Sequence, residues 1–245
     1  MSNGSTMRRI GSAAVAGAAA LAVLAPAASA ADRPSSAPAP VAAAEQSLGS
    51  KLTVKSYLQY LASRKTPEAK RTLKAFRALP KAKQQKFVGH LQNRKVYEAL
   101  TASLKGTTRP GGRRAATPYN ADVSFVKEVR VEAKGTIAGV NTRVSFAMSE
   151  EIFGIPVTTE KVSVQYLARG GRATKLLHGD ATVTNVNAAV DIKGGGKPRL
   201  VRGAASISAT WKATPRFASF GAALNKIQAL DAGVQGYWRA SLHNA

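Results

Sequence analysis

The chain has 245 residues, of which 44% are hydrophobic, and it contains no cysteine. That share of apolar residues argues against a chain that is disordered throughout, and the lack of cysteine excludes disulfide bonds, so a folded domain must be stable through packing alone. The formal net charge of +23 is distributed unevenly and needs an explanation.

The N-terminal residues predict an export signal. Arg8 and Arg9 form a short basic region, residues 10–24 are apolar or small, and residues 28–30 read Ala-Ser-Ala, the small-x-small pattern that signal peptidase accepts. A membrane-spanning helix needs about 20 apolar residues, and this apolar run is shorter. The arginine pair also allows a twin-arginine signal, but ordinary secretion fits better. We expect residues 1–30 to be a signal peptide and the mature protein to be secreted and extracellular, released or held loosely at the cell envelope by charge.

A flexible leader and a helical segment are expected next. Residues 31–46 are rich in Ala, Pro and Ser, which is typical of a flexible leader. Residues 47–106 show helical periodicity, with helix starts near Thr53, Thr66, Pro80 and Asn93. The apolar positions are Val54, Tyr57, Leu58 and Leu61; Ala69, Leu73, Phe76 and Leu79; Phe87, Val88 and Leu91; and Val96, Leu100 and Leu104. Helices of about ten residues are marginal alone, so we predict a small, compact bundle of about four helices.

Most of the positive charge lies in this part of the chain. Residues 48–118 carry seventeen Lys and Arg against Glu68 and Glu98, a net charge of +15, whereas residues 119–245 carry +7. The second predicted helix repeats basic residues at i, i+4, i+7 and i+11, opposite its apolar positions: Lys70, Lys74, Arg77 and Lys81. Such a row is either a solvated face that keeps the protein soluble or a binding site for polyanions.

The candidate partners of this row are an anionic cell-wall polymer, a lipid headgroup or extracellular nucleic acid. Aromatic side chains suited to stacking on bases fall mainly on the predicted buried faces. Nucleic-acid binding is therefore expected to lack sequence specificity and to be strongly salt-dependent. A further hypothesis concerns Gln84 and Gln85, which are acceptors for extracellular protein crosslinking if they are exposed, although Gln on a solvated helix is ordinary.

A linker is expected before a second, strand-rich part. Residues 107–118 contain Pro, Gly and paired basic residues, which predict an exposed linker open to proteases. Residues 119–245 then alternate apolar and polar side chains with period two. Seven or more short strands with one apolar face predict an antiparallel β-sandwich. We thus expect an α+β protein in two segregated parts.

Several local features refine the strand-rich part. Gly170 and Gly171 predict a tight hairpin turn, and residues 182–192 predict one long strand with a bulge near residues 185–187. Residues 194–197 read Gly-Gly-Gly-Lys and predict a flexible connection between strands. Helical periodicity predicts one accessory helix with four apolar positions: Phe220, Leu224, Ile227 and Leu230. Both tryptophans, Trp211 and Trp238, occupy inward positions and are expected in the core, which disfavours a role in stacking on carbohydrate.

No catalytic or metal motif is present. The three histidines, His90, His178 and His243, lie in different predicted elements without a nucleophile motif beside them. His178 and Asp180 are close in sequence, but the end of a hairpin accounts for them. Glu150 and Glu151 are adjacent in a strand, so they point to opposite faces and do not form an acid/base pair.

The sequence therefore predicts no enzyme, metal or cofactor. It favours a secreted binding or structural module that associates electrostatically with anionic polymers and presents the loops of the sandwich to a protein partner. The alternative is a secreted hydrolase or enzyme inhibitor whose site lies on those loops.

Overall fold

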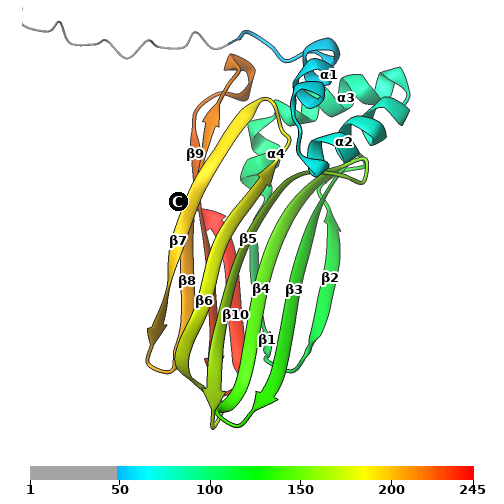
Figure 1. The fold of residues 1–245 in the computed structure, drawn as a ribbon. Helices are drawn as coiled ribbons and strands as arrows, with labels where there is room; N and C mark the ends of the chain where they lie inside the picture. Colours follow the sequence, from blue (N-terminus) through cyan, green and yellow to red (C-terminus); the bar gives the residue numbers. More distant parts are fainter. Residues whose placement is uncertain (1–48) are drawn as a thin grey trace, which may run out of the picture. The chain divides into compact units, whose positions relative to one another are not determined.

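The computed structural model of the protein describes residues 49–245. The predicted signal peptide at residues 1–30 and the predicted leader at residues 31–46 lie outside the described residues. The described part contains helices and two antiparallel β-sheets (Figure 1). The broad prediction of an α+β protein is confirmed.

Four helices come first, as the helical periodicity predicts. They are α1 (Val54–Ser63), α2 (Pro67–Ala78), α3 (Lys81–Leu91) and α4 (Arg94–Ala99). The side chains of Thr53, Thr66 and Asn93 each accept a backbone N–H from the first turn of α1, α2 and α4. These caps satisfy donors that a helix start leaves unpaired, which fixes where the helices begin. The four helices lie together at one end of the sheets (Figure 1).

Two five-stranded sheets follow, with the strand orders β2-β3-β4-β5-β6 and β1-β10-β9-β8-β7. The first consists of β2 (Gly111–Pro118), β3 (Val123–Thr136), β4 (Gly139–Ile152), β5 (Ile155–Arg169) and β6 (Arg172–Asn185). The second consists of β1 (Ala102–Thr107), β7 (Val190–Val201), β8 (Ala204–Pro215), β9 (Leu224–Val234) and β10 (Tyr237–Asn244). The predicted turn at Gly170 and Gly171 is confirmed, because both have positive φ and they join β5 to β6.

One core joins the helices to both sheets. The buried apolar residues of the four helices and of the two sheets form one continuous cluster, which contains both tryptophans as expected. Two hydrogen bonds link the helices to the β6–β7 connection: the Tyr57 hydroxyl donates to the carbonyl of Val186 at 3.2 Å, and the Asn187 amide donates to the carbonyl of Leu91 at 3.0 Å. The boundary expected at residues 107–118 therefore does not correspond to a break in the core.

The predicted linker and the end of the fourth predicted helix are wrong. Helix α4 ends at Ala99, so Leu104 lies in strand β1 instead of on a helical face. Residues 111–118 form strand β2, which pairs with β3 along its whole length. All residues of β2 are exposed, because this strand is at the edge of its sheet and has no core face. An edge strand of this kind lacks the apolar alternation by which strands are recognised in sequence.

The predicted accessory helix is also wrong. Residues 224–234 form strand β9, and only a short 3-10 helix, η1 (Ala218–Phe220), precedes it. Every second residue of β9 faces inward, as in an ordinary strand. Two of these inward residues are Lys226 and Gln228, both fully buried. These polar residues interrupt the apolar alternation and leave Leu224, Ile227 and Leu230 at a spacing that resembles a helix.

Two predictions about the β6–β7 region need correction as well. The long strand with a bulge is instead two strands, which end and begin at Asn185 and Val190. The Asn185 side chain holds the turn, since its amide donates to the Val190 carbonyl at 2.8 Å and its oxygen accepts the backbone N–H of Asn187 at 2.9 Å. The glycine run at residues 194–196 is part of β7 and not a flexible connection. A Cβ on Gly194 would overlap the carbonyl oxygen of Thr210 on the paired strand, so this position requires glycine.

Candidate binding surfaces

The four predicted polyanion-binding residues are all exposed at the helical end of the unit. Lys70, Lys74 and Arg77 lie on α2, whose opposite face is buried through Ala69, Thr72 and Phe76. The fourth, Lys81, is the first residue of α3, so the row does not run along a single helix as predicted. These four residues are called the basic helical surface below.

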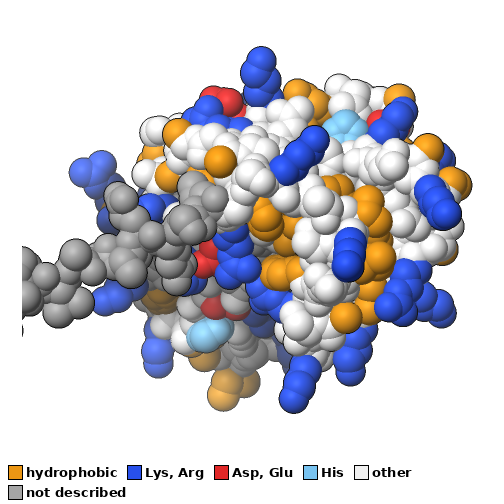
Figure 2. All heavy atoms as spheres, turned by 90° about the horizontal axis from the view of Figure 1, so that it is seen from above, with side chains coloured by type: hydrophobic (Ala, Val, Ile, Leu, Met, Phe, Trp, Pro, Cys, Tyr) orange, Lys and Arg blue, Asp and Glu red, His pale blue; other side chains and the backbone are white. Residues whose placement is uncertain are grey.

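The surroundings of the basic helical surface do not neutralise it. Residues 51–100 contain thirteen Lys and Arg against Glu68 and Glu98. Glu68 pairs with Arg71 at 3.0 Å and Glu98 pairs with Arg94 at 3.5 Å, both within one helix. No ion pair within residues 49–245 involves any of the four basic residues. Figure 2, which looks down on this end, shows Lys and Arg side chains spread over the visible face with few acidic groups.

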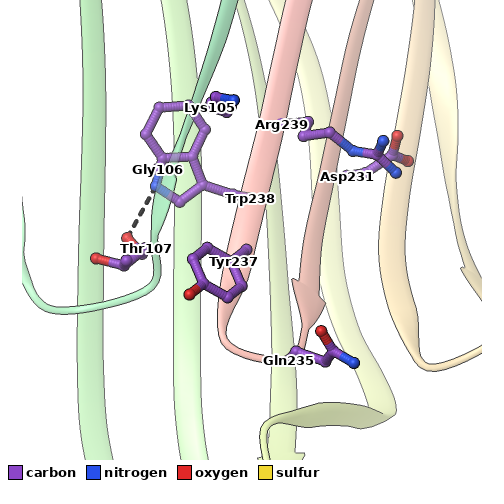
Figure 3. A pocket seen from close by; sticks show the side chains of 8 residues that line it. All are labelled: Lys105, Gly106, Thr107, Asp231, Gln235, Tyr237, Trp238 and Arg239. Atoms are coloured by element: carbon purple, nitrogen blue, oxygen red, sulfur yellow. Dashed lines mark hydrogen bonds between the residues drawn. The ribbon is translucent and has the colours of Figure 1, made fainter.

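A second surface lies on the outer face of the second sheet, over its strands β1, β10 and β9. Two adjoining hollows of about 560 and 600 Å³ share Lys105, Asp231 and Arg239. The strand register places these three side by side, because Arg239 on β10 lies opposite Lys105 on β1 and opposite Asp231 on β9 (Figure 3). Because side chains of the same parity share a face, Tyr237 lies on the same outer face. We call this depression the outer groove.

The residues on either side of the row of Lys105, Arg239 and Asp231 differ in side-chain chemistry. Toward the helical end, Ser241 pairs with Ser103 and with Ala229, and all three border the second hollow. In the other direction, Tyr237 is 57% exposed and stands near Gln235 and Thr107 at the first hollow. The outer groove thus has small and hydroxyl-bearing side chains at one end and an aromatic ring at the other.

A group of buried charges lies in the core beneath the helices. Glu150 on β4 and Glu160 on β5 face inward from one sheet, and Lys226 on β9 faces inward from the other. Glu160 accepts a short hydrogen bond from the Tyr97 hydroxyl of α4. The Lys226 ammonium donates to the carbonyl of Leu100 at 2.7 Å. These interactions connect the end of α4 to both sheets.

The ionisation of this group is strongly shifted by burial. Desolvation, reinforced by the nearby Glu160 carboxylate, raises the pKa of Glu150 to about 8. Desolvation also raises the pKa of Glu160 and lowers the pKa of Lys226. One carboxylate oxygen of each glutamate is buried without a hydrogen-bond partner in the described part. Two acids facing one ammonium, with unpaired oxygens, favour a proton held on one of the carboxyl groups at neutral pH.

The sequence did not reveal this group. In the sequence, Glu150 stands out only as the neighbour of Glu151. The prediction that the two point to opposite faces is confirmed, since Glu150 is buried and Glu151 pairs outward with Arg114 at 2.8 Å. The alternation of residues along a strand places Lys226 on the inward face. This inference requires that residues 224–234 are known to form a strand.

The histidines are in separate elements, as expected: His90 on α3, His178 on β6 and His243 on β10. His178 is exposed, and Asp180 accepts a short hydrogen bond from the Ser163 hydroxyl on the neighbouring strand. Across residues 49–245, no three His, Asp or Glu side chains gather closely enough to hold a metal ion.

The two glutamines proposed as crosslinking acceptors differ in the structure. The Gln84 amide is half-buried and donates to the carbonyl of Leu79 at 2.8 Å, whereas Gln85 is exposed. Only Gln85 has the accessibility that the crosslinking hypothesis requires.

Comparisons of the chain with protein-family models, with curated proteins and with solved structures give no match. Among the described helices, none is long and apolar enough to cross a membrane.

Proposed function

We propose that the protein is a secreted, non-enzymatic binding module that attaches to anionic polymers of the extracellular space or cell envelope through its basic helical surface. In this proposal the two sheets form an antiparallel sandwich that serves as a rigid base for the helices. Cell-wall polymer, lipid headgroups and extracellular nucleic acid are the candidate partners, bound without sequence specificity. A protein partner at the loops of the sheets is a separate part of the same proposal.

The observation that supports this proposal most is the exposure of all four basic residues without an acidic partner. Lys70, Lys74, Arg77 and Lys81 are solvent-exposed, and no ion pair in the described part occupies them. Like charges that are close together repel, and an external polyanion relieves that repulsion while it releases its own counterions.

Binding of labelled inorganic polyphosphate to the full chain tests the proposal. The variant carries four substitutions, Lys70→Gln, Lys74→Gln, Arg77→Gln and Lys81→Gln. A matched control removes the same charge from exposed lysines of the sheets: Lys134→Gln, Lys161→Gln, Lys175→Gln and Lys212→Gln. We expect the helical variant to weaken binding at least about tenfold more than the control, because contacts between Lys or Arg side chains and phosphates dominate the affinity for such polymers. Equal losses in both variants would show that net charge alone attracts the polymer, without a localised surface.

A further inference from the structure

The outer groove combines groups that are not used by the fold itself. The side chains of Lys105, Asp231 and Arg239 make no hydrogen bond or ion pair with any other residue in the part of the chain that the structure covers, and neither does the Tyr237 hydroxyl. The main-chain groups of β10 are paired on both sides, with β1 and with β9. The groove therefore offers side chains, and not a free strand edge, to a ligand.

The aromatic end of the groove is held in place by three segments. In the turn between β9 and β10, the carbonyl of Gly236 accepts the backbone N–H of Thr108 at 2.7 Å, and its N–H donates to the carbonyl of Gly171 at 2.9 Å. Gln235 in the same turn has a φ of 51°, a left-handed conformation that is uncommon for a residue other than glycine. The Trp238 indole lies against Gly106 and donates to the carbonyl of Thr107 at 2.9 Å. These contacts fix the strand end that carries Tyr237 before any ligand arrives.

The chemistry of the groove fits one ligand class better than others. A sugar ring has an apolar C–H face that packs on an aromatic side chain such as Tyr237, and hydroxyls that act as both donors and acceptors. Asp231 accepts hydrogen bonds, Arg239 and Lys105 donate them, and the serine hydroxyls do both. With two cations and one carboxylate, the groove carries too little positive charge to follow a phosphate backbone, but Arg239 can bind a single carboxylate in two-pronged fashion.

We propose that the outer groove binds a saccharide chain that carries carboxylates, with Tyr237 stacked on one ring and Arg239 paired with a carboxylate. The three rows of the groove extend over about 13 Å, since each strand residue adds about 3.3 Å. This length suits a short segment of a chain better than a single ring. The site is separate from the basic helical surface and does not depend on the function proposed for it.

Calorimetric titration of the full chain with trigalacturonic acid tests this inference, with its methyl ester as the matched ligand without charge. At about 150 mM salt, where charges more than about 8 Å apart are screened, we expect the acid to bind and the ester to bind about tenfold more weakly. Tyr237→Ala and Arg239→Gln should each weaken binding of the acid about tenfold. Arg239→Gln should leave binding of the ester nearly unchanged.

Matched variants separate this site from general effects. Tyr119→Ala and Lys212→Gln remove an exposed aromatic ring and an exposed cation elsewhere, and they should leave binding unchanged. Ala229→Phe adds bulk within the groove without removing a polar group, and it should block binding. The proposal is overturned if trigalacturonic acid gives no binding heat, if Tyr237→Ala and Arg239→Gln bind it as the parent does, or if an extended acidic peptide binds in its place. It also fails if the fourfold helical variant loses the trisaccharide, whereas loss of polyphosphate binding alone concerns only the function proposed above.

Discussion

Glu150 is a carboxyl group whose ionisation depends strongly on the fold. It is buried beside Glu160, Lys226 and Tyr57, and its pKa is raised from the ordinary value of 4.5 to about 8. Between these two values the unfolded chain has lost the proton while the folded protein retains it. Raising the pH through this interval therefore favours the unfolded state.

We expect the free energy of unfolding to fall by about 2–4 kcal/mol between pH 5 and pH 8, because each unit of pKa difference corresponds to about 1.4 kcal/mol. Urea denaturation at several pH values in this interval measures the slope. Glu150→Gln should reduce it, since the amide resembles the protonated acid and cannot ionise, and the slope that remains is the part due to Glu160, whose pKa burial also raises. Glu151→Gln is the control, because Glu151 points outward to Arg114 and its loss should leave the slope intact. Parallel curves for the parent and Glu150→Gln would refute the assignment.

Single residues differ in how well their surroundings follow from sequence. The exposure of Lys70, Lys74 and Arg77 was predictable, because the apolar residues of a single helix determine which of its faces packs inward and which faces solvent. The group around Glu150 and Lys226 was not predictable, because its members come from different sheets and meet only through tertiary packing.

The glycine run in β7 gives a prediction at the level of one element. Gly194 and Gly195 are adjacent, but a Cβ on Gly194 would overlap the main chain of β8, whereas a Cβ on Gly195 would enter open space. We expect Gly194→Ala to destabilise the protein by about 2 kcal/mol through overpacking. Gly195→Ala should be neutral or stabilising by up to about 1 kcal/mol, because it reduces the entropy of the unfolded chain. Denaturant midpoints of the two variants provide the comparison, and similar losses in both would contradict the close approach of β7 to β8.

Elements with one buried and one exposed face were predictable, and the others were not. The four helices and the strands β3, β4 and β5 carry clear apolar periodicity, and their existence follows from the sequence. Strand β2 has both faces exposed, and β9 has buried polar side chains, so each lacks the alternation that identifies a strand. Periodicity records which side chains are apolar, whereas strand pairing depends on main-chain hydrogen bonds, which most side chains tolerate whether they are apolar or polar.

At the scale of the whole described unit, the shared core predicts cooperative unfolding of helices and sheets. Trp211 and Trp238 are buried side chains of strands β8 and β10, and their fluorescence reports the packing of the strands, while circular dichroism at the helical band reports α1 to α4. Because both groups of elements contribute to one cluster, the two signals should change at the same urea concentration. Two separated transitions would show that the helices and the sheets are independent domains after all.

The proposed function requires a localised basic surface that binds polyanions, and the salt dependence of binding tests this requirement most directly. With a thymidine oligonucleotide as a polyanion without sequence information, the logarithm of the binding constant should fall linearly with the logarithm of salt concentration. For a single strand the slope changes by about 0.7 for each phosphate contact. Neutralising Lys70, Lys74, Arg77 and Lys81 should therefore reduce the slope by about 3. An unchanged slope in this variant, or binding that persists in about half-molar salt, where screening is strong, would contradict the account.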